Sequence, residues 1–338
     1  MKAAKLVDYG RIEIHEVPTP DVVNETDVQV QVKAVGICGT DIHMFKEPRA
    51  DVALPRIMGH ELTGIVTKVG NGVTLVKEGD RVALDPVYAC GTCPICKKGH
   101  PNVCPGVKCY GVQMDGGFCE YIVTGEEHLY PFSSKISFED AALVEPFSIA
   151  NNILDRAALT SGENLLIIGA GTIGLAILQV AKMKGARVMI TDVIPEKLGI
   201  AKDMGADVIV NSKEESLKDK ATAFADIGFD IVIDAVGITP LFQSALEYAA
   251  PCARIICIGF DGRAAQISPV TITKKELSII GSRMNNYKFP EVIEWLEEGN
   301  IQADKMITMK YSLDCIQTAF EETIANSSGN VKTIIVFN

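Results

Sequence analysis

Four cysteines in one short loop constrain this chain more than any other feature. Cys90, Cys93 and Cys96 recur at intervals of three, and Cys104 follows in a stretch rich in Gly, Pro and Lys. Cysteines at such spacing can bring four thiolates onto one tetrahedral Zn²⁺. A zinc with four protein ligands has no position left for a substrate, so we expect this zinc to hold a lobe of the protein in shape.

A cluster of disulfide bonds is the alternative interpretation of the same cysteines. Disulfides are typical of secreted proteins, whereas Met1-Lys2 leads directly into strand-like sequence with no secretory signal. We therefore expect zinc and a cytoplasmic location. Two further cysteines, Cys252 and Cys257, flank the apolar run around Ile255 and are expected to be small core residues.

Length and charge limit the classes of function. The chain has 338 residues, which exceeds the usual size of one domain and predicts two. No apolar stretch approaches the roughly 20 residues needed to cross a bilayer. The formal net charge of −11 disfavours a nucleic-acid surface, because phosphate binding needs clustered Lys and Arg. We expect a small-molecule substrate and neither a membrane nor a nucleic-acid partner.

The hydrophobic pattern changes near Asn151. Before it, strand-like alternation such as 28–35 is separated by turn signals rich in Gly and Asp. After it, short apolar runs alternate with helical patterns, which predicts a parallel sheet covered on both faces. The tail from Phe289 holds a helix with Trp295 and a last strand at 333–337, and we expect it to return to the first domain. The strands expected in the sheet are 165–168, 187–192, 207–210, 231–234, 254–259 and 278–281.

A glycine-rich segment follows the first of these strands. Gly169-Ala-Gly171-Thr-Ile-Gly174 opens a helix, and Asp192 ends the next strand, 18 residues after Gly174. In this context the motif is a dinucleotide fingerprint, with the pyrophosphate at the helix N-terminus. Asp192 can accept hydrogen bonds from a ribose diol and repel a 2′-phosphate, which favours NAD over NADP; the alternative is a surface Asp that ends a strand. The predicted cofactor-binding residues are Gly169, Gly171, Thr172, Ile173, Gly174 and Asp192.

A second set of metal-ligand types is dispersed through the first half: Cys38, His60, Glu61 and Glu145. Cys, His and carboxylate side chains all suit zinc, and a catalytic zinc needs three protein ligands plus an open position. Taken singly, a buried Cys and a core His are the simpler interpretation. Together with a closed zinc loop and a nucleotide fold, the set predicts a second, reactive zinc.

With these motifs the chain resembles the zinc-containing medium-chain dehydrogenase/reductase superfamily from end to end. The matching pieces are Gly59-His-Glu-x-x-Gly64-x5-Gly70-x2-Val73, the cysteine loop, the glycine fingerprint and Asp192. The resemblance implies an α/β fold, with a GroES-like mostly-β catalytic domain at 1–149, a Rossmann doubly wound parallel sheet domain at 150–287 and a C-terminal return at 288–338. It also implies two zincs per chain, NAD as the cofactor, and a homo-oligomer that is a dimer or a tetramer.

The family implies Cys38 and His60 as fixed ligands of the reactive zinc. Glu61 and Glu145 would share the remaining position, one ligating while the other works through water, and the sequence leaves open which. Typical alcohol dehydrogenases have Cys in place of Glu145. Sorbitol dehydrogenase and threonine dehydrogenase have Glu there, and their substrates are polar secondary alcohols. The resemblance therefore implies an oxidoreductase that takes hydride from a secondary hydroxyl.

The hydroxyl proton must leave, because an alkoxide expels hydride far more readily than an alcohol does. Thr40 and His43 stand two and five residues after Cys38. We interpret them as a hydroxyl–imidazole relay that carries this proton to solvent. The alternative is that Thr40 caps a helix and His43 only packs.

The segment 281–295 resembles the bacterial group that oxidises hexonates such as L-galactonate or L-gulonate at carbon 5. Arg283 matches a position that contacts substrate in sorbitol dehydrogenase, and its fork of N–H donors can hold hydroxyls or a carboxylate; the alternative is contact with the cofactor or a neighbouring subunit. Sorbitol (L-iditol) 2-dehydrogenase and L-threonine 3-dehydrogenase are alternative activities. A catalytically inert NAD-binding regulatory protein is an alternative of another class. A zincless quinone reductase is disfavoured, because it would lack the cysteine loop and the Gly-His-Glu segment.

Overall fold

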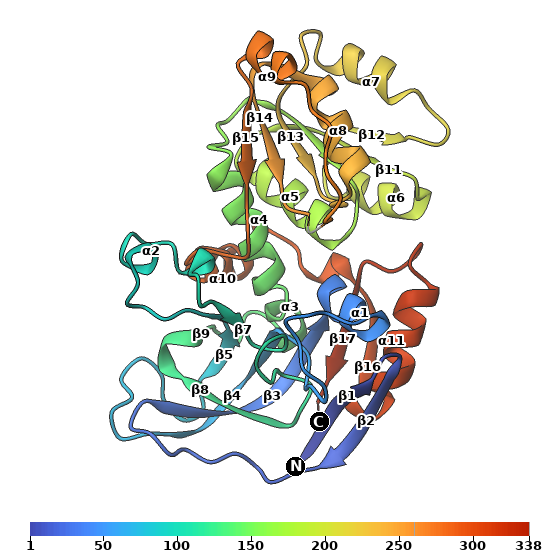
Figure 1. Cartoon of the computed structure of the whole chain (residues 1–338). Helices are drawn as coiled ribbons and strands as arrows, with labels where there is room; N and C mark the ends of the chain where they lie inside the picture. The colour runs from blue at the N-terminus through green and yellow to red at the C-terminus, as the bar shows by residue number, and fades with distance from the viewer. Residues whose placement is uncertain (260, 338) are drawn as a thin grey trace. The chain divides into compact units, whose positions relative to one another are not determined.

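The computed structural model describes residues 1–259 and 261–337. Its internal contacts divide the chain into two compact units, one formed by Met1–Glu145 with Asn286–Asn338 and the other by Pro146–Asn285 (Figure 1). The C-terminal tail therefore packs with the N-terminal half of the sequence. Among the described residues, no helix combines the length and the apolar character that crossing a membrane requires.

The first unit is built on a mostly antiparallel sheet. Its strand β3 (Asp27–Ile37) pairs antiparallel with β4 (Glu61–Val69), β8 (Tyr121–Gly125) and β17 (Lys332–Val336). The β17 pairing sets Thr333 opposite Ile37 and so joins the end of the chain to its beginning. The sheet extends through β5 (Arg81–Leu84), β9 (Leu129–Pro131) and β16 (Ile307–Ser312), and two smaller pairs are β1 (Lys2–Asp8) with β2 (Arg11–Glu16) and β6 (Val87–Tyr88) with β7 (Lys108–Cys109).

Aromatic and aliphatic side chains fill the core of this unit. Phe320 packs against Phe45 and Phe118, with ring centroids 5.2 and 5.9 Å apart. Burying one such side chain stabilises a fold by about 1.5–3 kcal/mol, so these contacts hold the helices that carry Phe45 and Phe320 against each other and against the loop that carries Phe118. The helices of the unit are α1 (Gly39–Lys46), α2 (Pro94–Lys97), α3 (Phe138–Ala141), α10 (Phe289–Glu298) and α11 (Ile316–Ala325), with 3₁₀ turns at 101–103, 126–128, 304–306 and 313–315.

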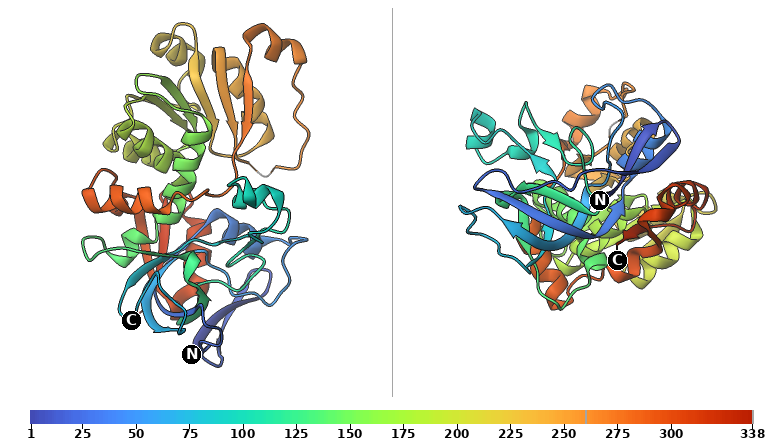
Figure 2. Two further views of the ribbon diagram at one scale, coloured as in Figure 1. Left: turned by 90° about the vertical axis from the view of Figure 1, so that its left-hand side faces the viewer. Right: turned by 90° about the horizontal axis from the view of Figure 1, so that it is seen from below.

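The second unit is a parallel sheet with helices on both faces (Figure 2). Among its described residues the strand order is β12-β11-β10-β13-β14-β15, and every neighbouring pair is parallel. The strands are β10 (Asn164–Ile168), β11 (Arg187–Asp192), β12 (Val208–Asn211), β13 (Phe229–Asp234), β14 (Ala249–Cys257) and β15 (Ser278–Gly281). The helices are α4 (Val144–Arg156), which begins in the first unit, α5 (Thr172–Met183), α6 (Pro195–Asp203), α7 (Leu217–Phe224), α8 (Thr239–Tyr248) and α9 (Pro269–Lys275). The predicted parallel sheet is thereby confirmed.

The prediction for Cys252 is wrong. β14 begins five residues earlier than the expected strand, and its pairing with β13 shifts register between Phe229 and Ile231. At this irregularity Cys252 adopts a φ of 63° and is exposed, while Cys257 is half-buried. The backbone leaves the regular ladder there, so the period-2 burial of a strand does not apply.

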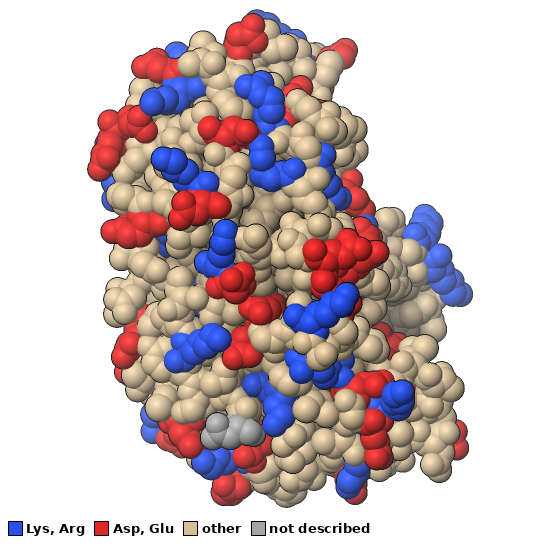
Figure 3. All heavy atoms as spheres, turned by 180° about the vertical axis from the view of Figure 1, so that it is seen from behind, with Lys and Arg blue, Asp and Glu red and all other residues tan. Residues whose placement is uncertain are grey.

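Charged side chains of both signs are mixed over the face of the molecule drawn in Figure 3. Acidic residues outnumber basic ones, 43 to 32. On that face Lys and Arg lie among Asp and Glu and form no continuous basic area. A mixed, acidic surface of this kind offers phosphate groups little net attraction.

Candidate functional site

The four cysteines of the loop meet in space. Their Sγ atoms lie 3.4 Å (Cys93–Cys96), 3.5 Å (Cys90–Cys104) and 3.9 Å (Cys90–Cys96 and Cys93–Cys104) apart. Four sulfurs at about 2.3 Å from one tetrahedral zinc are about 3.8 Å apart, whereas a disulfide would bring two of them to about 2.05 Å. The arrangement therefore fits zinc and not disulfides.

Backbone N–H groups of the loop point at two of these sulfurs, those of Cys90 and Cys93. Cys93 N–H donates to Cys90 Sγ, and Cys96 N–H donates to Cys93 Sγ, each at 3.4 Å. The amides of Thr92 and Cys93 lower the pKa of the Cys90 thiol to about 6. A lowered pKa favours the thiolate, which is the form that binds zinc.

A second metal-ligand cluster forms where β3 and β4 pair. Ligand atoms of Cys38, His60 and Glu61 all lie within 4.8 Å of one another. Cys38 follows β3 directly, Glu61 is the first residue of β4, and the register sets Glu61 opposite Gly36. The cluster offers one sulfur, one nitrogen and one carboxylate oxygen, a donor set that suits a catalytic zinc.

Glu145 lies in the first turn of α4 and is buried. Burial raises the pKa of Glu145 to about 8; His60 opposes this shift, and Glu61 adds to it. His60 and Glu61 therefore influence the protonation of Glu145. The structure groups three of the four ligand candidates, Cys38, His60 and Glu61, within 4.8 Å of one another, and Glu145 is not a member of that group.

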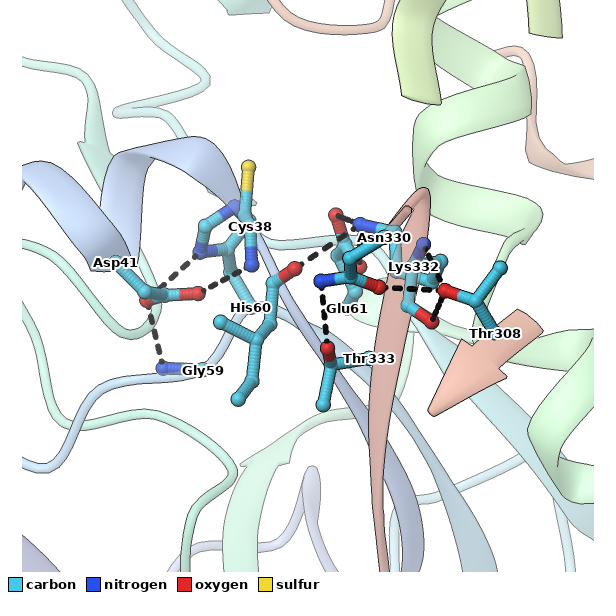
Figure 4. Close-up of polar contacts among 10 residues, drawn as sticks. Cys38, Asp41, Gly59, His60, Glu61, Thr308, Asn330, Lys332 and Thr333 are labelled. Carbon is cyan, nitrogen blue, oxygen red and sulfur yellow. Dashed lines mark hydrogen bonds and ion pairs between the residues drawn. The ribbon is translucent and has the colours of Figure 1, made fainter. Parts of the chain in front are cut away.

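Asp41 is a member of this site that the sequence reasoning missed. Its carboxylate is fully buried, accepts the Cys38 N–H at 2.9 Å and the Gly59 N–H at 3.3 Å, and lies 3.7 Å from His60 Nδ1 (Figure 4). One side chain therefore fixes the backbone at Cys38 and lies close to His60 Nδ1 without hydrogen-bonding it. A carboxylate behind a ligating His commonly orients the ring of that His.

The electrostatics of His60 follow from the same contact. Burial alone would lower the pKa of His60, but Asp41 and Cys38 outweigh burial and raise this pKa well above its usual value. The neutral imidazole is the form that ligates a metal, so a raised pKa of His60 opposes metal binding as the pH falls.

Lys332 is the second residue that the sequence reasoning missed. Its ammonium donates to both carboxylate oxygens of Glu61 at 2.8 Å and to the carbonyl of Ile37 at 3.2 Å (Figure 4). Burial lowers the pKa of Lys332, but Glu61 and Cys38 outweigh it, so the net shift is upward. Gly36 leaves the space for this pair, since a Cβ there would lie 2.0 Å from Glu61 Oε2.

Thr40 and His43 both lie on α1. Cys38 is the residue before the helix, and Asp41 accepts its N–H, so Thr40 is not the capping residue. The His43 side chain is 71% exposed, with Nδ1 3.8 Å from a carboxylate oxygen of Glu47. His43 therefore faces water and is not packed in the core.

The glycine fingerprint joins β10 to α5. Gly171 is the residue before the helix, and Thr172 and Ile173 are half-buried in its first turn. A Cβ on Gly174 would lie 1.9 Å from the carbonyl oxygen of Gly169, which has a φ of 105°. Any larger side chain at position 174 would push the helix away from the turn, so the third glycine keeps the helix N-terminus close to the strand.

Asp192 ends β11 beside this turn. Its Oδ2 accepts the Ala170 N–H at 2.6 Å, and its Oδ1 accepts the N–H groups of Val193 and Ile194 at 2.7 and 3.0 Å. The carboxylate is thus held in one orientation by the glycine turn and by its own loop. Arg283, the predicted substrate residue, is exposed in the segment after β15.

Comparison with known proteins decides the family. Residues 24–134 match the alcohol dehydrogenase GroES-like domain, and residues 172–298 match the zinc-binding dehydrogenase domain. The starvation-sensing protein RspB of Escherichia coli K12 is 36% identical over 96% of this chain and 95% of its own. The chain belongs to the zinc-dependent alcohol dehydrogenase family. The resemblance read from the sequence and the predicted pair of domain folds are thereby confirmed.

Further relatives place the chain in the polyol and sugar-acid group of zinc-dependent alcohol dehydrogenases. Sorbitol dehydrogenase of Bacillus subtilis is 33% identical, covering 100% of this chain and 98% of its own. L-galactonate-5-dehydrogenase of E. coli K12 is 32% identical, and the match covers 95% of this chain and 94% of its own. A crystal structure of RspB from E. coli CFT073 with NADH superposes with a TM-score of 0.92 at 36% identity, covering 100% of this chain and 99% of that one. The chain is therefore a zinc- and NAD-dependent polyol or sugar dehydrogenase, with the cysteine quartet as its structural zinc site and a Cys/His/Glu catalytic zinc site.

Proposed function

We propose that this enzyme oxidises a secondary hydroxyl of a polyol or sugar acid to the ketone. The leading candidate substrates are L-galactonate and L-gulonate, with oxidation at carbon 5. The observation that carries the proposal is the metal cluster itself, in which Cys38 and His60 are joined by the carboxylate of Glu61 and not by a second thiolate. The similarity to L-galactonate-5-dehydrogenase supports it. Sorbitol is the second candidate, supported by the similarity to sorbitol dehydrogenase over the whole chain.

The proposed catalytic residues are Cys38, Thr40, His43, His60, Glu61 and Glu145. When bound, zinc lowers the pKa of an alcohol hydroxyl and NAD accepts the hydride; a shift like that of zinc-bound water, from about 15.7 to about 7, is worth roughly 12 kcal/mol. Asp41 holds Cys38 and His60 in place for this metal. The hydroxyl of Thr40 receives the substrate proton and the imidazole of His43 passes it to water, a role that the exposure of His43 supports.

The proposed cofactor contacts are Gly169, Gly171, Thr172, Ile173, Gly174 and Asp192. The oriented Asp192 carboxylate accepts the ribose hydroxyls and excludes a 2′-phosphate by charge. We also propose a homo-oligomer, a dimer or a tetramer, whose mass light scattering measures directly.

A substrate panel tests the proposed function. L-galactonate, L-gulonate, sorbitol, L-iditol and L-threonine are each supplied with NAD⁺, and NADH absorbance is followed. The highest kcat/KM is expected for a hexonate, and production of the ketone at carbon 5 identifies the position. Turnover of threonine alone, or of no member of the panel, would refute the proposal.

Asp192→Ala is expected to lower kcat/KM for NAD⁺ by tenfold or more and to relax discrimination against NADP⁺. Two hydrogen bonds to a carboxylate contribute about 1.5–3 kcal/mol each, and the repelling charge disappears with them. Steady-state kinetics with both cofactors measure the effect, and exposed Asp203→Ala on α6 is the matched control. If the unmodified enzyme already prefers NADP⁺, the role of Asp192 is wrong.

Arg283→Lys is expected to lower kcat/KM for a hexonate roughly ten- to a hundredfold. The loss of a paired, charge-assisted contact to a carboxylate is worth about 1.5–3 kcal/mol. Sorbitol has no charge, so its kcat/KM changes less. Arg11→Lys on β2 serves as the control. Equal losses for both substrates would show that Arg283 supports the cofactor or the fold instead.

A further inference from the structure

The ion pair of Glu61 and Lys332 is closed to solvent and complete. The two side chains are 1% and 2% exposed. The Lys332 ammonium has three hydrogens, and each has an acceptor: the two oxygens of Glu61 and the carbonyl of Ile37. The ammonium therefore engages both oxygens of the same carboxylate that belongs to the metal cluster.

Hydrogen bonds from neighbouring side chains fix the backbone around Lys332. The Thr308 hydroxyl accepts the Val331 and Lys332 N–H groups at 3.0 and 3.3 Å and donates to Asn330 Oδ1 at 2.5 Å. Asn330, two residues before β17, donates to the Thr333 hydroxyl at 3.0 Å (Figure 4). These contacts fix the backbone at Lys332, and the three acceptors of its ammonium hold the side chain beside Glu61.

A cation in this place alters how Glu61 binds a metal. Cys38 as thiolate and Glu61 as carboxylate bring two negative charges to the cluster, and Lys332 already balances one of them. A divalent cation held by Cys38 and His60 then competes with Lys332 for the charge of Glu61, and the two cations repel each other. A fixed ammonium on both oxygens makes Glu61 a weaker metal ligand than a free carboxylate would be.

We propose that Lys332 is a positioning residue that keeps Glu61 a weak, exchangeable ligand of the catalytic zinc, so that this position opens to substrate in each turnover. The inference rests on the proposed assignment of Cys38, His60 and Glu61 to that zinc. A purely structural ion pair predicts the opposite behaviour, since its loss would disturb the cluster and release the metal. The direction in which zinc retention changes therefore distinguishes the two roles.

Lys332→Met removes the charge and keeps most of the side-chain length. Zinc-loaded enzyme is mixed with an excess of the chelating dye 4-(2-pyridylazo)resorcinol, and zinc release is followed by absorbance. The catalytic zinc is expected in the fast phase and the quartet zinc in the slow phase. In the variant the fast phase is expected to slow at least tenfold, kcat to fall at least tenfold, and the slow phase to stay unchanged. A fast phase that is unchanged or faster overturns the proposal.

Lys332→Arg is the conservative control, because it keeps the charge and can reach both oxygens of a carboxylate. Its rate of zinc release is expected within threefold of the unmodified enzyme. An Arg variant that retains zinc as strongly as the Met variant would show that the charge is not the cause, and it would overturn the proposal.

A double variant covers the case in which Lys332→Met fails to fold with Glu61 left unpaired. Glu61→Gln alone leaves the ammonium unbalanced beside the metal and is expected to release the fast-phase zinc at least tenfold faster. In Glu61→Gln/Lys332→Met the fast phase of zinc release is expected to be at least threefold slower than in Glu61→Gln alone. No recovery overturns the role of Lys332.

Cys38→Ser separates this inference from the site on which it rests. The Cys38→Ser variant is expected to show no fast phase of zinc release, because the catalytic zinc is lost. If it retains both zincs, the proposed site is wrong and the role of Lys332 fails with it. If it loses one zinc while Lys332→Met changes nothing, only the role of Lys332 is refuted.

Discussion

Cys38→Ser is expected to lower kcat/KM by at least a thousandfold while the protein stays folded. The full effect of zinc on the substrate hydroxyl is roughly 12 kcal/mol, and losing only about 4 kcal/mol of it already costs a thousandfold. Serine cannot replace a thiolate as a zinc ligand at neutral pH, so the metal content is expected to fall from two zincs per chain to one. Metal analysis, steady-state kinetics and thermal unfolding measure the three quantities.

The fold of Cys38→Ser is expected to persist because Cys38 lies at a strand end and makes no large core contact. Cys315→Ser is the matched control, since Cys315 is exposed and belongs to neither metal cluster. Its activity and zinc content are expected to equal those of the unmodified enzyme. A Cys38→Ser enzyme that keeps two zincs and full activity would refute the catalytic assignment.

The parallel sheet was predictable because its strands are buried on both faces and read as short apolar runs. The run Leu165–Ile168 and the end of β11 at Asp192 coincide with the observed strands. The glycine fingerprint has equally local causes, since Gly174 is required by a contact with Gly169 only five residues away. Features that depend on residues close together in the sequence can therefore be predicted from the sequence pattern.

Lys332 shows where pattern fails. Its partner Glu61 is 271 residues away in the sequence, and the contact exists only because β17 and β4 both pair with β3. Hydrophobic periodicity gives the strands but not their order, so it cannot assign such a pair. The available signal was a single lysine inside the apolar strand 332–336, a residue that is seldom fully buried unless it has a partner.

Asp41 was missed for a different reason. It lies between Cys38 and His43, where an acidic residue in a first helical turn is ordinary. Its importance comes from complete burial and from its contacts with Gly59 and His60, which depend on how α1 sits against the start of β4. Three-dimensional packing, not residue type, makes it part of the metal site.

Cys93→Ser is expected to have the largest effect on stability. Structural zinc contributes about 10–16 kcal/mol of binding free energy in small zinc domains, whereas a whole protein is stable by about 5–15 kcal/mol. The Cys93 sulfur contacts two other sulfurs of the quartet and also caps the N-terminus of α2 by accepting the Cys96 N–H. Loss of this ligand is therefore expected to unfold or aggregate the protein, as zinc analysis, light scattering and thermal unfolding can measure. Exposed Cys252→Ser is the control, with no expected change. A Cys93→Ser protein with unaltered Tm and two zincs would show that the quartet does not hold the fold together.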